Sequence, residues 1–130
     1  MINHITMRVN DLEKSKKFFS HLLAPLGYRL LFEKGNSAGY GIEDANGKRD
    51  FWIHSGEAGQ AVHSFSCLAF TAGSKQMVED FYKAGLEAGG KDNGPPGYRP
   101  DYYPGYYAAF ILDPDLHNIE VVFDDVSLFT

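Results

Sequence analysis

Two side chains that can transfer protons or bind metal interrupt segments whose patterns predict strands. His4 lies in a stretch of alternating apolar and polar residues, on the face opposite Ile5, Met7 and Val9. Glu120 interrupts an apolar run, where a charged side chain is costly to bury without a partner. Each has a simpler explanation, because His4 could be a hydrogen-bonded structural histidine and Glu120 an outward-facing residue of a half-solvated sheet. Both are therefore candidates for a functional site.

A cluster of tyrosines follows a segment rich in glycine and proline. Five of the eight tyrosines are close together in the sequence, at Tyr98, Tyr102, Tyr103, Tyr106 and Tyr107. The cluster begins in a loop where no core requires aromatic residues, so together with Arg99 it predicts the wall or lid of a binding pocket. Packing of an ordered loop on its own module is the alternative. Arg8 shares the face of His4, where it is either a partner for an anionic substrate group or a cation at the rim.

Composition excludes several classes of protein. The 130 residues carry 12 basic and 17 acidic side chains without a dense basic run, so we expect no nucleic-acid partner. No stretch approaches the roughly 18 uncharged apolar residues of a membrane helix, and no signal-peptide pattern opens the sequence. The one cysteine, Cys67, cannot form an internal disulfide and suits a reducing compartment. We therefore expect a single cytoplasmic domain over residues 1–130, with no membrane partner.

An internal repeat divides this domain into two parts. A shift of 63 residues aligns the strand pattern that begins at residue 5 with the one that begins at residue 68, and it places Cys67 at the position of His4. Further along, a shift of 69 residues brings Phe51 onto Glu120. An aromatic residue at that position suggests an enclosed face, so we favour a functional role for Glu120, as a metal ligand or as a general base.

Each repeat predicts a strand, a capped helix and further strands. The expected fold is α+β, with two βαβββ modules at about residues 1–56 and 63–126 that form a curved mixed sheet with helices on its outer face. The expected strands are 2–9, 28–33, 37–43, 50–54, 65–71, 106–112 and 117–123. Asn10 and Glu13 resemble a capping box before the first helix, and Ser74 is expected to cap the second. Residues 90–105 are expected to contain a long loop.

These motifs resemble the vicinal oxygen chelate superfamily, which includes glyoxalase I, extradiol dioxygenases and bleomycin-resistance proteins. The resemblance covers the whole chain and is most specific in HITMRVNDLEKSKKFF at residues 4–19 and YYAAFILDPDLHNIEVV at residues 106–122. The segment GGKDNGPPGYRPDYYPGYY at residues 89–107 resembles a subgroup of glyoxalase-like proteins. The resemblance implies a cleft that holds a divalent metal, and a homodimer in which two subunits often complete each cleft.

The resemblance also implies a set of metal ligands. His4 matches the first family ligand and Glu120 the last, whereas Cys67 stands where the family has its second histidine. His63 lies four residues upstream of Cys67, about 13 Å away at about 3.3 Å per strand residue, which is too far to replace that ligand. The implied ions are Zn²⁺, Mn²⁺, Ni²⁺ or Fe²⁺. A cysteine thiolate suits Zn²⁺ and is a poor ligand for Mn²⁺.

The resemblance leaves two main functions open. The first is a metal-dependent lyase or isomerase of the glyoxalase type with Glu120 as its catalytic residue; a dioxygenase is less expected because one histidine of the two-His-one-carboxylate set is missing. The alternative is a metal-free protein that binds an aromatic or antibiotic-like small molecule, and a structural dimer with a vestigial site is a weaker third option. The expected substrate-binding residues are Arg8, Phe51, Cys67, Tyr98, Arg99, Tyr102, Tyr103 and Tyr106. The chain departs from the subgroup at Asp101 and Tyr103, where histidines are common, and at Leu116, where a turn glycine is usual.

Overall fold

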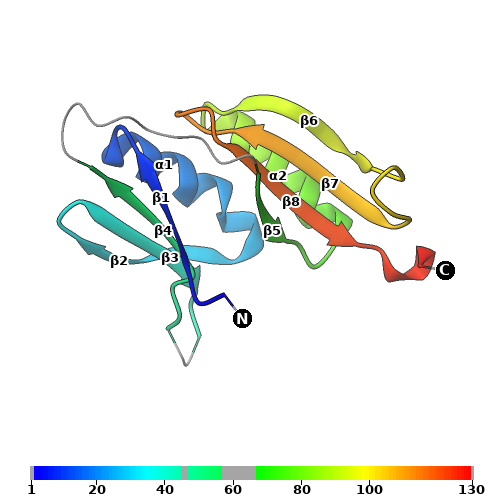
Figure 1. Ribbon diagram of the computed structural model, residues 1–130, viewed down its shortest axis with the longest axis horizontal. Helices are drawn as coiled ribbons and strands as arrows, with labels where there is room; N and C mark the ends of the chain where they lie inside the picture. Colours follow the sequence, from blue (N-terminus) through cyan, green and yellow to red (C-terminus); the bar gives the residue numbers. More distant parts are fainter. Residues whose placement is uncertain (1, 45–46, 57–66, 130) are drawn as a thin grey trace.

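The computed structural model describes residues 2–44, 47–56 and 67–129, which form two four-stranded sheets, each with one α-helix (Figure 1). The first module contains β1 (Ile5–Val9), α1 (Leu12–Leu22), the 3-10 turn η1 (Ala24–Leu26), β2 (Tyr28–Lys34), β3 (Ser37–Ile42) and β4 (Phe51–Ser55). The second contains β5 (Leu68–Thr71), α2 (Lys75–Glu87), β6 (Lys91–Tyr98), β7 (Tyr106–Leu112), β8 (Asn118–Asp124) and the 3-10 turn η2 (Val126–Leu128).

The two sheets have the same topology. Their strand orders are β1-β4-β3-β2 and β5-β8-β7-β6, and in each the first strand runs parallel to the last while the other neighbours are antiparallel. The predicted α+β class with two βαβββ modules is therefore confirmed. The start of the strand predicted at 65–71 and His63 lie outside the described residues. In the part of the chain that is described, no helix combines the length and apolar character that a bilayer crossing requires.

Helix caps explain where the helices begin, with one difference from the sequence prediction. Ser74 caps α2 by accepting a hydrogen bond from the amide of Met77, as expected. At α1 the cap is Asp11, whose carboxylate accepts from the amide of Lys14, and the prediction that Asn10 is the cap was wrong. Asn10 instead donates one hydrogen bond from its backbone amide and one from its side chain to Asp115, on the turn between β7 and β8, and thereby joins the two modules.

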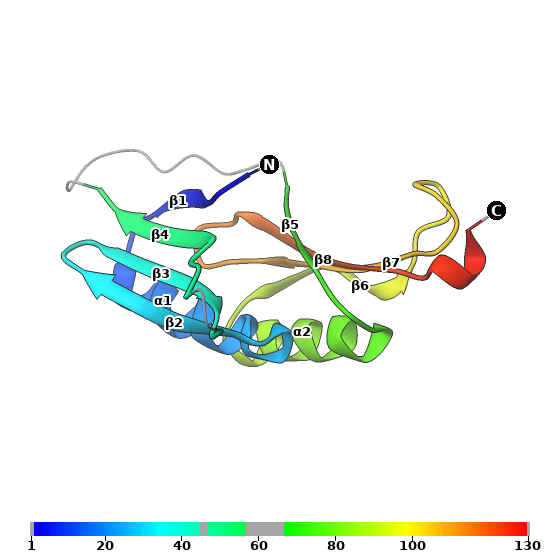
Figure 2. The ribbon, with the colours of Figure 1, turned by 90° about the horizontal axis from the view of Figure 1, so that it is seen from below.

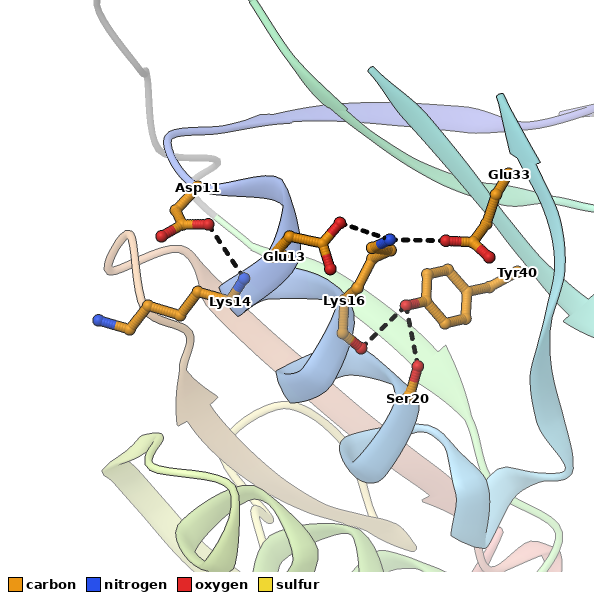
Figure 3. A network of polar contacts seen from close by, with 7 residues as sticks. All are labelled: Asp11, Glu13, Lys14, Lys16, Ser20, Glu33 and Tyr40. Carbon is orange, nitrogen blue, oxygen red and sulfur yellow. Dashed lines mark hydrogen bonds and ion pairs between the residues drawn. The ribbon is translucent and has the colours of Figure 1, made fainter. Parts of the chain in front are cut away.

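A polar network fastens α1 to its own sheet (Figure 3). The ammonium of Lys16 lies 2.7 Å from the carboxylate of Glu13 and 2.6 Å from that of Glu33 on β2. Tyr40 of β3 is fully buried, and its hydroxyl donates to the carbonyl of Lys16 and shares a hydrogen bond with Ser20. Burial raises the pKa of Tyr40, so the phenol keeps its proton and the donor role.

Both helices lie on the same side of the sheets, which leaves the other face of each sheet uncovered by helices (Figure 2). Phe18 of α1 and Phe81 of α2 are almost fully buried on the helix side. The helices also approach each other closely, because a Cβ atom at Gly85 of α2 would lie only 3.0 Å from Cδ1 of Leu22. A larger residue at this crossing would therefore require the side chains of Leu22 and Ile111 to shift.

An aromatic contact joins the two modules on the helix side. Phe70 of β5 packs edge-to-face against Phe51 and Tyr28 of the first module, with ring centroids 5.3 and 5.5 Å apart. Phe51 in turn packs against Phe19 at 5.1 Å. These rings belong to a single buried cluster that runs through both modules, so the chain has one continuous core.

Strand β6 was not predicted. Its sequence, KDNGPPGY, contains two glycines and two prolines, and we expected a loop there. The structure pairs it with β7 as the edge of the second sheet, with register shifts around Gly94. Proline cannot donate a ladder hydrogen bond, and an irregular edge strand tolerates this.

We expect Phe18→Ala and Phe81→Ala each to lower the free energy of unfolding by about 3–5 kcal/mol, because each removes a buried ring and leaves a cavity between helix and sheet. Denaturant unfolding followed by circular dichroism measures the change. Leu86→Ala is the matched control: Leu86 lies on α2 but is 42% exposed, so its loss should be below about 1 kcal/mol. Losses of that size for both phenylalanine variants would contradict the assigned helix faces.

Candidate functional site

Glu120 lies at the centre of a hydrogen-bonded group on the open face of the second sheet. The residue is only 4% exposed. One oxygen accepts from the thiol of Cys67, with Sγ and Oε1 3.1 Å apart, and the other accepts from the hydroxyl of Tyr106. The parallel register pairs Ala69 with Glu120, so Cys67, two residues before Ala69, faces the same side. A buried carboxylate needs hydrogen-bond donors, and Glu120 has two of them, Cys67 and Tyr106.

Strand geometry explains how Tyr106 reaches this carboxylate. Tyr106 pairs with Asp124, one end of the β7–β8 ladder, and Phe110 pairs with Glu120. The residue between them on the same face of β7 is Ala108, whose methyl group leaves room for the tyrosine ring. Ala108 is fully buried although it lies on the face away from the helices.

Two further tyrosines cover Tyr106. The rings of Tyr102 and Tyr103 pack edge-on against it, with centroids 4.7 and 5.0 Å away. Tyr103 also contacts Phe129 and donates a hydrogen bond to Asp124. Tyr102 is 60% exposed and Tyr103 40% exposed, so this aromatic cover is open to solvent on its outer side.

The two donors to Glu120 keep their protons at neutral pH. Burial raises the pKa of Cys67 to about 12, with a further contribution from its hydrogen bond to Glu120. Burial and then the hydrogen bond to Glu120 also raise the pKa of Tyr106. Cys67 is therefore a thiol that donates a hydrogen bond, not a nucleophilic thiolate. The group consists of one carboxylate acceptor and two weak acids.

Arg99 lies on the same face, above a neighbour of Glu120. Its guanidinium is 5.5 Å from the ring centroid of Phe110 and donates to the carbonyls of Pro95 and Gly97. Gly94 has φ +151, and a Cβ atom there would lie 2.9 Å from Phe110 and 3.2 Å from Arg99. The irregular β6 strand thus makes the space in which the guanidinium is held.

The open face of the first sheet carries a second set of candidates. His4 is exposed, its Nδ1 lies 2.8 Å from the side chain of Asn3, and it shares a depression with Arg49 and Trp52. Arg49 lies over the ring of Phe32 at 5.1 Å, and its carbonyl accepts from the indole of Trp52. Arg8 is exposed on the same face. This face is aromatic and cationic, whereas the face around Glu120 is aromatic and acidic.

A single chain does not assemble the metal ligands that the resemblance implies. Among the described residues, the only three His, Cys, Asp or Glu side chains whose ligand atoms lie within 4.8 Å of one another are Asp113, Asp115 and His117. His4 therefore does not join Cys67 and Glu120, and these residues do not fit a three-ligand metal site within one chain.

The Asp113, Asp115 and His117 cluster could hold a cation, but its carboxylates already have partners. Asp113 accepts from the amides of Asp115 and His117, and its second oxygen is 2.7 Å from Nδ1 of His117. Asp115 accepts from Asn10. These hydrogen bonds account for the cluster as a stabilised β7–β8 turn.

The structure places two of the predicted substrate-binding residues on the helix side, away from Glu120. Phe51 belongs to the buried core, and the parallel ladders pair Ile5 with Phe51 and Leu68 with Ile119. The residue equivalent to Glu120 is therefore Trp52, which corrects the alignment made from the sequence. The side chain of Tyr98 packs against Tyr107 at 5.0 Å and contacts Lys75 of α2, on the same side as the helices.

The other predicted residues fall into two groups. Cys67, Arg99, Tyr102, Tyr103 and Tyr106 gather with Glu120 on the second sheet, and His4 and Arg8 lie on the first. Three further residues on the open side, Arg49, Trp52 and Phe110, were not predicted from the sequence. Alternation could have found Trp52, because its neighbours Phe51 and Ile53 are both core residues.

We expect Cys67 to react slowly with iodoacetamide at neutral pH, with a rate that goes on rising past about pH 10 without levelling off, because its pKa is raised to about 12. Glu120→Gln should move this midpoint down by removing the negative acceptor. Glu79→Gln is the control, since Glu79 bonds to Tyr107 on the helix side. The chain has no second cysteine to interfere. A midpoint near the usual thiol value of about 8.5 in the folded protein would contradict the assigned contact.

Comparison with known proteins places these features in a family. A glyoxalase/bleomycin resistance protein from Albidiferax ferrireducens is 32% identical, with 92% of this chain and 95% of that chain covered and a TM-score of 0.78. A glyoxalase/bleomycin resistance protein/dioxygenase family enzyme from Burkholderia phytofirmans has the same fold at 16% identity, with coverage of 95% and 98% and a TM-score of 0.73. A mutant of glyoxalase I from Zea mays matches at 23% identity and a TM-score of 0.70, with 93% of this chain but 46% of that chain covered.

No curated protein matches the chain. A family model does, over residues 1–121, and this range includes the first module, most of the second and Glu120. The chain belongs to the Glyoxalase/Bleomycin resistance protein/Dioxygenase superfamily.

Proposed function

We propose that this chain binds a small organic molecule in a concave cleft and that Glu120 is the central polar group of that cleft. The observation that carries the proposal is the burial of Glu120 beneath Tyr106 on a face that no helix covers. A buried carboxylate with dedicated donors is unusual in a sheet that only packs, because an apolar residue would fill the same space at lower cost. Clefts with a few convergent polar groups among aromatic side chains are typical ligand sites.

The chemistry available at this site is proton transfer. A substrate that displaces Tyr106 or Cys67 would meet the carboxylate of Glu120 as a general base and the displaced hydroxyl or thiol as a hydrogen-bond donor. This supports a lyase or isomerase of the glyoxalase type, in which Glu120 takes a proton from the substrate. Arg99, Tyr102 and Tyr103 line the approach, and Arg99 offers a cation on this face for an anionic substrate group.

We further propose that the cleft is completed by a second copy of the chain. The open face of the first module carries His4, Arg8 and Arg49, whereas that of the second carries Glu120 and Asp124. Apposition of the first face of one subunit with the second face of its partner brings opposite charges together. A twofold axis then produces two identical clefts. We also propose that this dimer is cytoplasmic, because a single cysteine that cannot form an internal disulfide suits a reducing compartment.

In such a dimer, Glu120 and His4 of the partner subunit would hold one Zn²⁺, Mn²⁺, Ni²⁺ or Fe²⁺ ion. Such an ion would supply Lewis-acid polarisation of substrate oxygens. With the thiol of Cys67 protonated where the family has its second histidine, we expect weak binding of the ion.

A metal-free binding protein is the second candidate function. It is favoured by the hydrogen bonds that occupy both oxygens of Glu120 and by the aromatic cover of Tyr102 and Tyr103. In this case the ligand would be an aromatic or antibiotic-like molecule that stacks on those rings.

We expect the chain to be a dimer in solution, with a mass about twice 14.5 kDa by size-exclusion chromatography with light scattering. Arg8→Glu should weaken the dimer, because it places a negative charge opposite the acidic face. Lys83→Glu, which makes the same charge change on the exposed surface of α2, away from the open faces, is the control. A monomer at micromolar concentration would argue against the composite cleft.

Calorimetric titration with elemental analysis distinguishes the two functions. Wild type should take up about one divalent ion per chain weakly, His4→Ala should abolish uptake, and Cys67→His should tighten it by restoring an imidazole ligand. His21→Ala, on the helix surface, is the control.

If neither wild type nor Cys67→His binds any of the four ions, the metal-dependent enzyme is excluded and the metal-free protein takes its place. The fluorescence of Trp52, the only tryptophan, then reports cleft occupancy by aromatic ligands. Ligand quenching that Glu120→Gln leaves unchanged would show that Glu120 is not part of the cleft.

A further inference from the structure

A groove on the helix side of the molecule is separate from the face that carries Glu120. It has a volume of about 640 Å³, within the usual range for small-molecule sites. One wall comes from α1, another from the C-terminal end of α2, and the rim from the β7–β8 turn. Its lining residues are Lys14, Lys17, Phe18, His21, Glu87, Ala88, Gly89, Lys91, Asp113, Pro114 and Leu116.

The charges in this groove are mostly positive, although the chain as a whole carries a net charge of -5. Lys14, Lys17 and Lys91 are exposed, and no carboxylate of the described residues forms an ion pair with any of them. Lys16, one residue before Lys17, is held by two glutamates on the other side of α1, while Lys14 extends away from that network (Figure 3).

Acidic groups in the groove do not neutralise these lysines. Both oxygens of Asp113 are engaged by amides and by the imidazole of His117 within the turn. Glu87 is the remaining carboxylate, and it is exposed at the end of α2. The lining therefore carries three ammonium groups against two carboxylates, and the buried Asp113 is already hydrogen-bonded within the turn, so the groove keeps an excess of positive charge.

Leu116 contributes an apolar side chain to the same groove, and its backbone has an unfavourable conformation. It has φ +66, which among the described residues makes it the only residue other than glycine with a positive φ. Its side chain is 53% exposed, so burial within the chain does not compensate for this strained conformation. Strained residues of this kind are concentrated at binding sites.

We propose that this groove binds a small organic anion, with a phosphate or carboxylate group held by Lys14, Lys17 and Lys91 and a short apolar body packed against Leu116, Pro114 and Ala88. The charged group of the ligand matches the lysines of the lining, and its apolar body matches the apolar side chains there. This site does not depend on the function proposed for Glu120, because the two lie on opposite sides of the second sheet.

Calorimetric titration with hexyl phosphate tests the groove. We expect one molecule to bind per chain with a dissociation constant below about 1 mM, and inorganic phosphate and hexanol each to bind at least about tenfold more weakly. The double variant Lys14→Gln/Lys17→Gln should weaken hexyl phosphate binding by about tenfold or more, and added salt should weaken it in wild type.

Two further variants separate a ligand site from a general charge effect. Leu116→Gly should weaken binding severalfold without lowering the melting temperature, because glycine relieves the strained conformation while removing the apolar contact. Lys34→Gln removes an exposed cation on β2 and should leave binding unchanged. Equal losses for Lys34→Gln and the double variant, equal affinity for inorganic phosphate, or adsorption to anionic lipid vesicles without saturable hexyl phosphate binding would each overturn the proposal.

Discussion

The insertion of Phe70 between Phe51 and Tyr28 is the contact on which the arrangement of the two modules depends. It places the first strand of the second module against the end of the first sheet, and the close approach of α2 to α1 at Gly85 supports the same geometry. All of these contacts lie on the helix side, where burial of apolar area supplies most of the stability. The core therefore fixes both sheets without using their open faces, and those faces are free to carry polar side chains.

Glu120 is a buried polar side chain on one of these open faces. A glutamate that is 4% exposed requires partners for its carboxylate, and this site provides a thiol and a phenol rather than a cation. An imidazole at position 67 could share a metal with Glu120, whereas the protonated thiol of Cys67 donates a hydrogen bond to it. The resemblance implies a histidine ligand at this position, whereas the thiol that stands there donates a hydrogen bond that orients the carboxylate. For this reason we expect weak binding of a metal in the site proposed for His4 and Glu120.

The repeat and the alternation of apolar residues predicted most of the fold, and the failures have physical causes. Strand β6 escaped because its glycines and prolines are compatible with an irregular edge strand as well as with a loop. The shift of 69 residues that matched Phe51 to Glu120 differs by one from the shift of 68 that the ladders impose between Phe51 and Ile119. Since side chains alternate, a slip of one residue exchanges the two faces of a strand, and Trp52 was overlooked for that reason. When the loops of the two modules differ in length, strand pairing decides which residues are equivalent. This pairing cannot be deduced from the sequence repeat alone.

The β7–β8 turn links the candidate sites to each other and to the first module. Hydrogen bonds from Asn10 to Asp115 tie the end of β1 to this turn, and Asp113 closes the turn onto His117. Strand β8 begins at Asn118, directly after His117, and carries Glu120 two residues further on. The contacts that hold the turn therefore also fix the position of Glu120 relative to β1. The turn residue Leu116 faces the cationic groove on the helix side. A ligand that altered the turn from that groove would act at the start of the strand that carries the buried carboxylate, through covalent connection rather than through a long chain of packing contacts.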